Sequence, residues 1–438
     1  MAWLFGTPMA WALETPKGWG GSSQPKEGAT MAWRRLWTIA FRDLLRNRRR
    51  AVLTLLAVAL GYAMLMILNG WVAGILEDSL QNSIRLQTGH VQIRNEAYEM
   101  EKLSLLWADL IEAPGALAAQ AEGLPEVKAA APVLWASGIL STIGDTAGLQ
   151  IYGIEPASPL HASIREAMVA GDHLAAGDRD GILIGQRLAD DLGIGVGQNV
   201  NLAVIDADGQ LDEGVFTVRG LFSTGIFAYD DGAAFLPLSK AQAFTGAGDR
   251  ASAVVLLLNE QDDADAVAAA LQSPGAEVLT WRELNALLLT AVEMGMSFYY
   301  ILDLIVMLIV AVIIANTLLM SVFERFREMG ILAALGMTRG QIRWMFLFEA
   351  VILGLAGLVV GFLLGSAGVM YLSTAGIPAG DMGAAAGSIA MGSVMYARFV
   401  PGTFLGLGIG MMAIILLASL YPAWFASRLE PVEALHAY

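Results

Sequence analysis

The sequence has no cysteine and little charge. Of its 438 residues, 15% are charged and 56% are hydrophobic, whereas a typical soluble domain has about 25% charged residues. The lack of cysteine excludes disulfide bonds and thiolate metal sites. The charge deficit indicates a membrane protein.

Motifs for catalysis and for binding phosphate are also lacking. No G-x-x-x-x-G-K-[ST] phosphate loop and no G-x-S-x-G nucleophile motif occurs. The four histidines, His90, His161, His173 and His436, are not paired at the spacing of metal ligands. We therefore expect no catalytic residue, no metal site and no cofactor in this chain.

The negative charge is concentrated in one part of the chain. The formal net charge is −15, and residues 74–292 alone hold 30 acidic and 11 basic residues, a balance of −19. The rest of the chain is therefore net basic. This distribution predicts an acidic soluble domain, and its charge makes nucleic acid an unsuitable partner.

Long apolar runs lie on both sides of the acidic region. A helix of about 20 apolar residues is long enough to cross a bilayer. Strand-like and helix-like runs alternate irregularly inside the acidic region, which favours a mixed α+β domain over a doubly wound sheet. We predict four transmembrane helices with a large extracytoplasmic α+β domain between the first and the second. The predicted spans are residues 51–76, 301–323, 346–373 and 400–427.

The distribution of arginine predicts the orientation of these spans. Seven arginines precede the first span, and four lie between the second and the third. The loop between the third and fourth spans has only two charged residues, Asp381 and Arg398. Because basic loops stay in the cytoplasm, we expect both termini inside the cell and residues 77–300 on the outer side of the membrane.

The remaining segments complete the predicted organisation. Residues 77–300 begin and end with helical periodicity, which predicts a stalk. Trp33, Trp37 and the arginines around them suit an amphipathic helix on the cytoplasmic face. The predicted segments outside the spans are a disordered tail over 1–30, this helix over 31–50, the domain over 77–300, a cytoplasmic segment over 324–345, an external loop over 374–399 and a tail over 428–438.

Small residues recur every four positions in two of the spans. Such ladders let helix backbones approach closely in lipid. We expect them to serve packing within the chain, with dimer contacts or a moving interface as the alternative. Asp303 lies at the outer edge of the second span, where a structural or interfacial placement is expected. The ladder glycines are Gly357, Gly361, Gly365, Gly402, Gly406 and Gly410.

The cytoplasmic segment is the most informative one. Its sequence, ERFREMGILAALGMTRGQI over residues 324–342, is a short helix-forming stretch that we expect to break at Gly336 and Gly340. It joins two spans, so it lies on the membrane surface. Charges at its base would anchor it, and residues from Met329 to Gln341 would project toward a partner.

This segment closely resembles the part of MacB/LolC/FtsX permeases that meets their ATPase. RLQTGHVQI (85–93), YGIEP (152–156) and IGQRLADDLGIGVGQNVNL (184–202) are similar to the external domain of LolC-like permeases. The end of the chain is similar too, although the family's last residues often read ALR. The resemblance covers roughly residues 31–438.

The resemblance implies an ABC transporter permease of the mechanotransmission type, closest to the stand-alone LolC and LolE proteins. Its expected partners are two cytoplasmic ATPase subunits, which bind ATP and Mg, a second permease chain, identical or different, and a periplasmic chaperone or adaptor. The residues expected to couple to the ATPase are Glu324, Arg325, Arg327, Glu328, Met329, Gly330, Leu332, Gly336, Met337, Thr338 and Arg339.

The resemblance leaves two classes of function open. The size of the external domain favours transport. The cargo would be a lipoprotein or another lipid-anchored molecule that is extracted or exported, or peptides or antibiotics that are expelled as in MacB. The other class is FtsX-like signalling to a periplasmic hydrolase. For a lipid-anchored cargo, we expect the outer ends of the first two spans to line the cavity, at Leu68, Trp71, Ile75, Phe298, Tyr299 and Ile301.

Overall fold

The computed structural model describes residues 37–42, 44, 46–99, 102–103, 105–380 and 390–428. The expected tail over 1–30 lies outside the described residues, and so do most of the tail over 428–438 and part of the loop over 374–399. Residues 37–42 are helical, within the predicted cytoplasmic helix.

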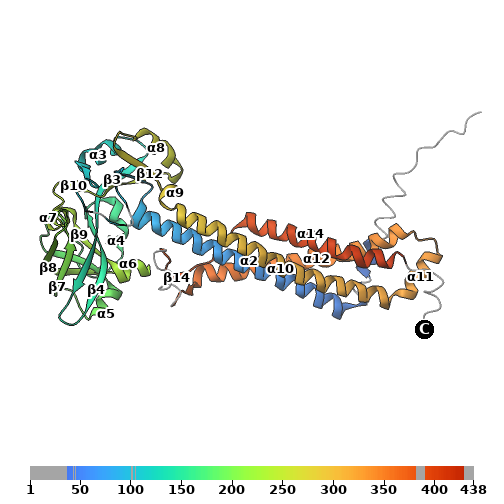
Figure 1. Ribbon diagram of the computed structural model, residues 1–438. Helices are drawn as coiled ribbons and strands as arrows, with labels where there is room; N and C mark the ends of the chain where they lie inside the picture. The colour runs from blue at the N-terminus through green and yellow to red at the C-terminus, as the bar shows by residue number, and fades with distance from the viewer. Residues whose placement is uncertain are drawn as a thin grey trace, which may run out of the picture. The chain divides into compact units, whose positions relative to one another are not determined.

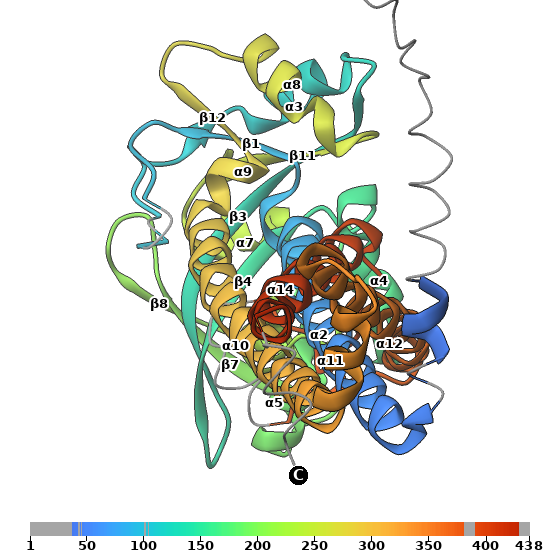
Figure 2. The same ribbon diagram turned by 90° about the vertical axis from the view of Figure 1, so that its right-hand side faces the viewer.

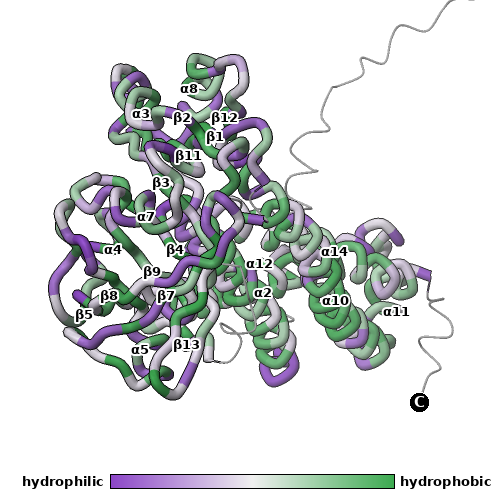
Figure 3. The backbone as a smooth tube through the Cα atoms, turned by 60° about the vertical axis from the view of Figure 1, so that its left-hand side comes forward, coloured by the Kyte–Doolittle hydropathy of each residue, from purple (hydrophilic) through white to green (hydrophobic). Residues whose placement is uncertain are grey.

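Among the described residues, four helices are long and apolar enough to cross a membrane. Hydrophobic residues dominate them along most of their length (Figure 3). They are α2 (Arg48–Ser83), α10 (Ala286–Glu324), α12 (Arg339–Ala375) and α14 (Pro401–Ala426). The predicted fold class is confirmed: four apolar helices, with an α+β domain between the first and the second (Figure 1).

The domain is built around a ten-stranded, mostly antiparallel sheet. Its strand order is β12-β1-β11-β3-β4-β9-β6-β8-β5, and β7 pairs with β3 and β8. In the described part of the domain, β4–β9 and β6–β8 are parallel and the other strand pairs are antiparallel. The strands are β1 (Val91–Asn95), β3 (Val127–Ser141), β4 (Thr146–Ile154), β5 (Met168–Gly171), β6 (Gly181–Gly185), β7 (Asn199–Ile205), β8 (Leu211–Phe222), β9 (Ala233–Pro237), β11 (Ala253–Leu258) and β12 (Ala276–Thr280).

Short helices complete the domain cores. Helices α3 (Pro114–Glu122) and α8 (Ala264–Ala270) pack on β1, β11 and β12 (Figure 2). The other short helices are α4 (Ala162–Glu166), α5 (Gln186–Leu192), α6 (Phe227–Gly232), α7 (Leu238–Phe244) and α9 (Trp281–Leu284), and the 3-10 turns are η2 (Pro159–His161) and η3 (Gln261–Asp263). Two small sheets have two strands each: β2 (Ile111–Glu112) pairs with β10 (Arg250–Ala251), and β13 (Ile377–Pro378) pairs with β14 (Val394–Met395).

The helices that enter and leave the domain are hydrogen-bonded to each other. Helix α2 runs into a π-helical turn, η1 (Ile84–Thr88), just before β1. The Ser83 hydroxyl donates to Asn285 Oδ1 at 2.7 Å, and the Asn285 amide donates to the Trp281 carbonyl at 2.8 Å. Because these side chains are buried, the bonds hold the outer end of α2 to the segment that begins α10.

The chain divides into two compact units, which are described separately below. The first comprises Met1–Leu56, Ala311–Ala356 and Met412–Tyr438. The second comprises Ala57–Val310 and Gly357–Met411, and it contains the sheet. Each of the four long helices contributes residues to both units.

Candidate functional site

In the first unit, a short helix separates α10 from α12. Helix α10 ends at Glu324 and α11 spans Phe326–Ala334, nine residues. Arg325 between them has φ −111° and ψ 15°, outside helical geometry. The chain therefore bends at Arg325, and α11 is a separate element between two apolar helices.

The end of α11 is a glycine-dependent cap. Gly336 has φ +96°, a conformation that favours glycine. The Met337 amide donates to the Leu332 carbonyl and the Gly336 amide to the Ala333 carbonyl, both at 3.0 Å. This is the Schellman arrangement, which satisfies the last carbonyls of a helix. It gives α11 a sharp end at the predicted glycine.

The second expected break, at Gly340, is wrong. Helix α12 begins at Arg339, so Gly340 is its second residue. The Thr338 hydroxyl accepts from the Gln341 amide at 3.4 Å, and Gln341 Oε1 accepts from the Thr338 amide at 2.8 Å. This reciprocal pair is a capping box. Thr338-x-x-Gln341 was visible in the sequence and would have placed the start of the helix.

Helix α11 has a buried face and an exposed one. Met329 is 2% exposed and packs in a cluster with Val322, Ile342 and Phe346. Ile331 and Leu335 are 46% and 79% exposed. Met329 therefore anchors the helix instead of meeting a partner, contrary to the expectation that the projecting part begins there. Exposed positions among the expected coupling residues are Glu324, Arg327, Glu328, Gly336, Thr338 and Arg339, whereas Arg325 and Gly330 are buried and Leu332 and Met337 are half-buried.

The base of α11 is rich in ion pairs. Arg325, with a side chain 6% exposed, lies 3.1 Å from Glu328 and 3.9 Å from Glu349. Arg46 also reaches Glu328, at 2.7 Å, and Arg50 lies 3.0 Å from Glu324. Partial burial raises the pKa of Glu328, but hydrogen bonds from Arg325 and Arg46 outweigh it and hold the pKa below its usual value. The carboxylate is therefore ionised at neutral pH.

In the second unit, an apolar groove of about 410 Å³ runs along α2. Leu372 of α12 and Ile377 of β13 form its other wall. Its α2 residues are Leu60, Ala63, Met64, Ile67, Leu68 and Trp71. The groove thus uses two residues of the expected cargo cavity, Leu68 and Trp71.

The other residues expected there do not line this groove. Phe298 and Ile301 are 59% and 57% exposed on α10, Tyr299 stacks edge-on against Phe298, and Ile75 is half-buried on α2. Helical geometry explains the difference. Asn69 faces α10, and Trp71, two residues further on, is turned about 200° away at 3.6 residues per turn. Within one chain, the groove therefore lies between α2 and α12.

Helices α2 and α10 meet at a buried polar pair. The Asn69 amide donates to Asp303 Oδ1 at 2.9 Å, and Asp303 is 4% exposed. The other carboxyl oxygen, Oδ2, is buried with no hydrogen-bond partner among the described residues. Asp303 is therefore buried between α2 and α10, where it has a structural role.

The glycine ladders differ between the two helices. A Cβ on Gly361 would lie 2.6 Å from the Ala59 carbonyl oxygen, and one on Gly365 would lie 3.2 Å from Ala63 Cα. Helix α12 therefore packs its ladder against α2. On α14, a Cβ added to Gly402 or Gly406 would meet no described atom within 4 Å. A Cβ added to Gly410 would lie 3.5 Å from the Met307 side chain. Gly357 is buried.

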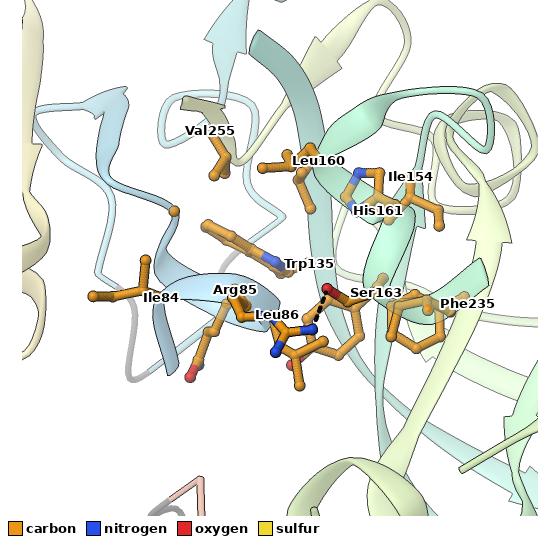
Figure 4. Close-up of a pocket in the computed structure, with 15 residues that line it drawn as sticks. Ile84, Arg85, Leu86, Trp135, Ile154, Leu160, His161, Ser163, Phe235 and Val255 are labelled. Atoms are coloured by element: carbon orange, nitrogen blue, oxygen red, sulfur yellow. Dashed lines mark hydrogen bonds between the residues drawn. The ribbon is translucent and has the colours of Figure 1, made fainter. Parts of the chain in front are cut away.

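A small cavity of about 20 Å³ lies where η1 meets the domain core (Figure 4). Arg85 Nη2 donates to Ser163 Oγ at 3.2 Å across one side of it. His161 also lines this cavity; burial, together with the nearby His173 and Arg165, lowers the pKa of its imidazole to about 3. The ring is neutral and Nε2 has no described partner. The cavity lies between η1, which follows α2, and the strands of the sheet.

Two family models match the chain over most of its length. Residues 51–273 match the MacB-like periplasmic core domain. The chain belongs to the MacB-like family of permeases. In this MacB-like permease, residues 300–431 also match the FtsX-like permease C-terminal domain. Both matches are to permease domains, and no ATPase domain is found in this chain.

Relatives of this permease are named for different functions. It is 25% identical to the lipoprotein-releasing system transmembrane protein LolC of Neisseria meningitidis, over 88% of this chain and 93% of that protein. It is 22% identical to LolE of Haemophilus influenzae, over 87% and 93%. It is 27% identical to the macrolide export ATP-binding/permease protein MacB of Hyphomonas neptunium, over 91% of this chain and 60% of that protein.

Proposed function

We propose that this multi-pass membrane protein is the permease subunit of an ABC transporter that converts ATP hydrolysis on a separate chain into movement of its external domain. The observation that carries the proposal is α11, a capped helix with a fixed base and an exposed apolar end at Ile331 and Leu335. A rigid element of this kind suits a groove on a partner. The family membership supports an ATPase as that partner.

The full assembly proposed here has two ATPase subunits, which bind ATP and Mg, and two permease chains in the bacterial inner membrane. Both termini and α11 lie in the cytoplasm, since the arginines cluster there. The sheet domain lies in the periplasm, where it meets a chaperone or adaptor.

Affinity purification of tagged protein from native membranes tests the ATPase proposal. Mass spectrometry should identify an ABC ATPase with the wild-type chain, and Leu335→Asp should lose most of it because a charge replaces the exposed apolar tip. Leu211→Asp is the matched control, a 67% exposed leucine on β8 of the external domain. Recovery of no ATPase with the wild-type chain would reject the proposal.

We further propose that the cargo is a lipoprotein or another lipid-anchored molecule. The LolC likeness and the apolar groove on α2 support this. Exposing an acyl chain to water costs about 0.8 kcal/mol per CH₂, so extraction needs a dry apolar surface. The groove, with Leu68 and Trp71, offers one. Efflux of peptides or antibiotics as in MacB, or signalling to a periplasmic hydrolase, is the alternative.

Site-specific photocrosslinking distinguishes these cargoes. A photoreactive residue replaces Met64, which is 60% exposed in the groove, or Ile409, which is 63% exposed on α14 and serves as the control. Lipoprotein adducts enriched at position 64 support extraction. Equal labelling by phospholipid at both positions, or adducts to a soluble peptide or hydrolase, would move the proposal to the alternatives.

A further inference from the structure

The bend at Arg325 lies between two carboxylates one helical turn apart. Glu324 is the last residue of α10, and Glu328 lies in the first turn of α11. Their side chains are 43% and 46% exposed. Whatever binds these two carboxylates therefore controls the direction in which α11 leaves α10.

Two arginines with the same spacing bind them. Arg46 Nη2 donates to both oxygens of Glu328, at 2.7 and 2.9 Å, and Arg50 Nη1 donates to Glu324 at 3.0 Å. The pairs run in opposite directions along the chain, 46 with 328 and 50 with 324. A shift by one turn would place Arg50 at Glu328 and leave Glu324 without its arginine. The spacing thus fixes one register.

The segment around these arginines is held independently of them. The Trp37 ring contacts the Phe348 ring of α12 edge-on, with centroids 5.5 Å apart. Ile39 packs against the apolar cluster that contains Met329 of α11. Trp37 and Ile39 therefore contact α12 and the apolar cluster that holds α11. An arm fixed in this way can hold the carboxylates of the bend in position.

Ion pairs as exposed as these contribute little to folding stability. Their geometry is nevertheless specific, because one arginine reaches both oxygens of Glu328 and a buried arginine, Arg325, binds the same carboxylate. A weak but specific contact at a bend changes orientation more than stability. Orientation is what a docked helix needs in order to transmit force.

We propose that the described residues 37–42, 44 and 46–50 form a positioning arm of the ATPase-coupling helix, in which Arg46 and Arg50 set the angle of α11 through Glu328 and Glu324. The inference rests on the proposed ATPase partner and deepens it, since it assigns control of the coupling site to a segment outside the site. Arg46 and Arg50 are positioning residues: they orient α11 and do not touch the ATPase.

A charge-swap series in the purified permease–ATPase complex tests the arm. Arg50→Glu and Glu324→Arg each place like charges together and should lower the ATP turnover of the complex about three- to fivefold, the effect of one exposed ion pair. The amount of ATPase that copurifies should stay near wild type. The double variant Arg50→Glu/Glu324→Arg restores an opposite pair and should recover most of the turnover.

Arg49→Glu is the matched control, because Arg49 adjoins Arg50, is exposed and has no ion pair among the described residues. It should leave turnover unchanged. Failure of the double variant to recover turnover, or an equal loss in Arg49→Glu, would overturn the arm while leaving the ATPase proposal intact. Absence of ATPase from the wild-type preparation would instead reject both.

Crosslinking gives a second test that does not depend on charge. The chain has no cysteine, so Arg46→Cys/Glu328→Cys has two thiols only. A short cleavable bifunctional thiol reagent should join them, and ATP turnover should then become independent of Glu324→Arg because the angle is locked. Failure to crosslink, or continued sensitivity to Glu324→Arg after crosslinking, would contradict the arm.

Discussion

The two units of the chain bury their ionisable groups in different ways. Around α11, the buried Arg325 lies between Glu328 and Glu349, and Arg50 binds Glu324. In the external domain, burial lowers the pKa of His161 to about 3 and raises the pKa of Tyr152 to about 12, so both side chains are neutral at pH 7. Arg94, 3.9 Å from Glu277, and the buried Asp230, which accepts hydrogen bonds from Ser223 and Thr224, are exceptions there.

This difference shows where paired charges add to apolar packing. Paired charges have specific directions, so around α11 they fix the angle between helices at a bend, beside the apolar cluster that holds Met329. The external domain depends on the apolar clusters between its sheet and helices. The proposed transmission of force needs a fixed angle at its input and a stiff core at its output.

Removing the buried charge of Arg325 should have the largest effect, and it should be confined to the unit that contains α11. Arg325→Met takes a cation from a site where Glu349 is itself 8% exposed. Loss of one partner of a buried ion pair costs about 3–5 kcal/mol, so α11 should lose its fixed position. Hydrogen exchange should show greatly increased amide exchange over residues 324–345, with the domain strands unchanged.

Arg327→Met is the control for that variant, since Arg327 is exposed on the same turn. It should change local stability by no more than about 0.5 kcal/mol, as surface substitutions usually do. Equal exchange in the two variants would mean that the buried network does not hold the bend.

Composition and arginine placement were enough to predict the four helices, the domain between the first two and the charged segment around Glu324. These features depend on hydropathy and charge, which a single sequence displays directly. The partner of each charge was not predictable. Arg46 and Glu328 are 282 positions apart, and only the packing of helices brings them together.

The groove shows the same limit. Leu68 and Trp71 were predicted to line a cargo cavity with residues of α10, and the groove that contains them is completed by residues of α12 and β13. The sequence shows that a face of α2 is apolar. It does not show that Asn69 binds Asp303 and so turns that face away from α10. The start of α12 is different, because its capping residues, Thr338 and Gln341, lie three positions apart and the sequence alone can predict it.

Acid should destabilise the external domain, because the buried His161 is neutral in the folded protein. The folded pKa of His161, about 3, lies below its ordinary value of 6.5, so its contribution to stability is complete above pH 6.5 and is lost as pH falls. At pH 5 the loss is about 2 kcal/mol, from 1.36 kcal/mol per pH unit. Hydrogen exchange of β3 and β4, corrected for intrinsic rates, measures it at pH 7.5 and pH 5.

His161→Gln cannot titrate and supplies the comparison. Its local stability should change less between the two pH values than that of the wild-type protein. If both proteins lose the same stability, another group is responsible for the acid sensitivity of the domain. The segment around α11 should respond little over this range, because the pKa of Glu328 lies below its usual value.

The smallest expected effect separates the two glycines of the coupling segment. Gly336→Ala places a Cβ at φ +96°, which costs about 1–2 kcal/mol, and it should fray the end of α11. Gly340→Ala meets no described atom within 4 Å and lies inside α12, so it should stabilise that helix by up to about 1 kcal/mol. Amide exchange at Met337 and Gln341 reports the two ends separately. Opposite signs at the two positions would show that α11 ends at Gly336 and α12 has begun by Gly340, whereas losses at both would restore the two-break interpretation of the sequence.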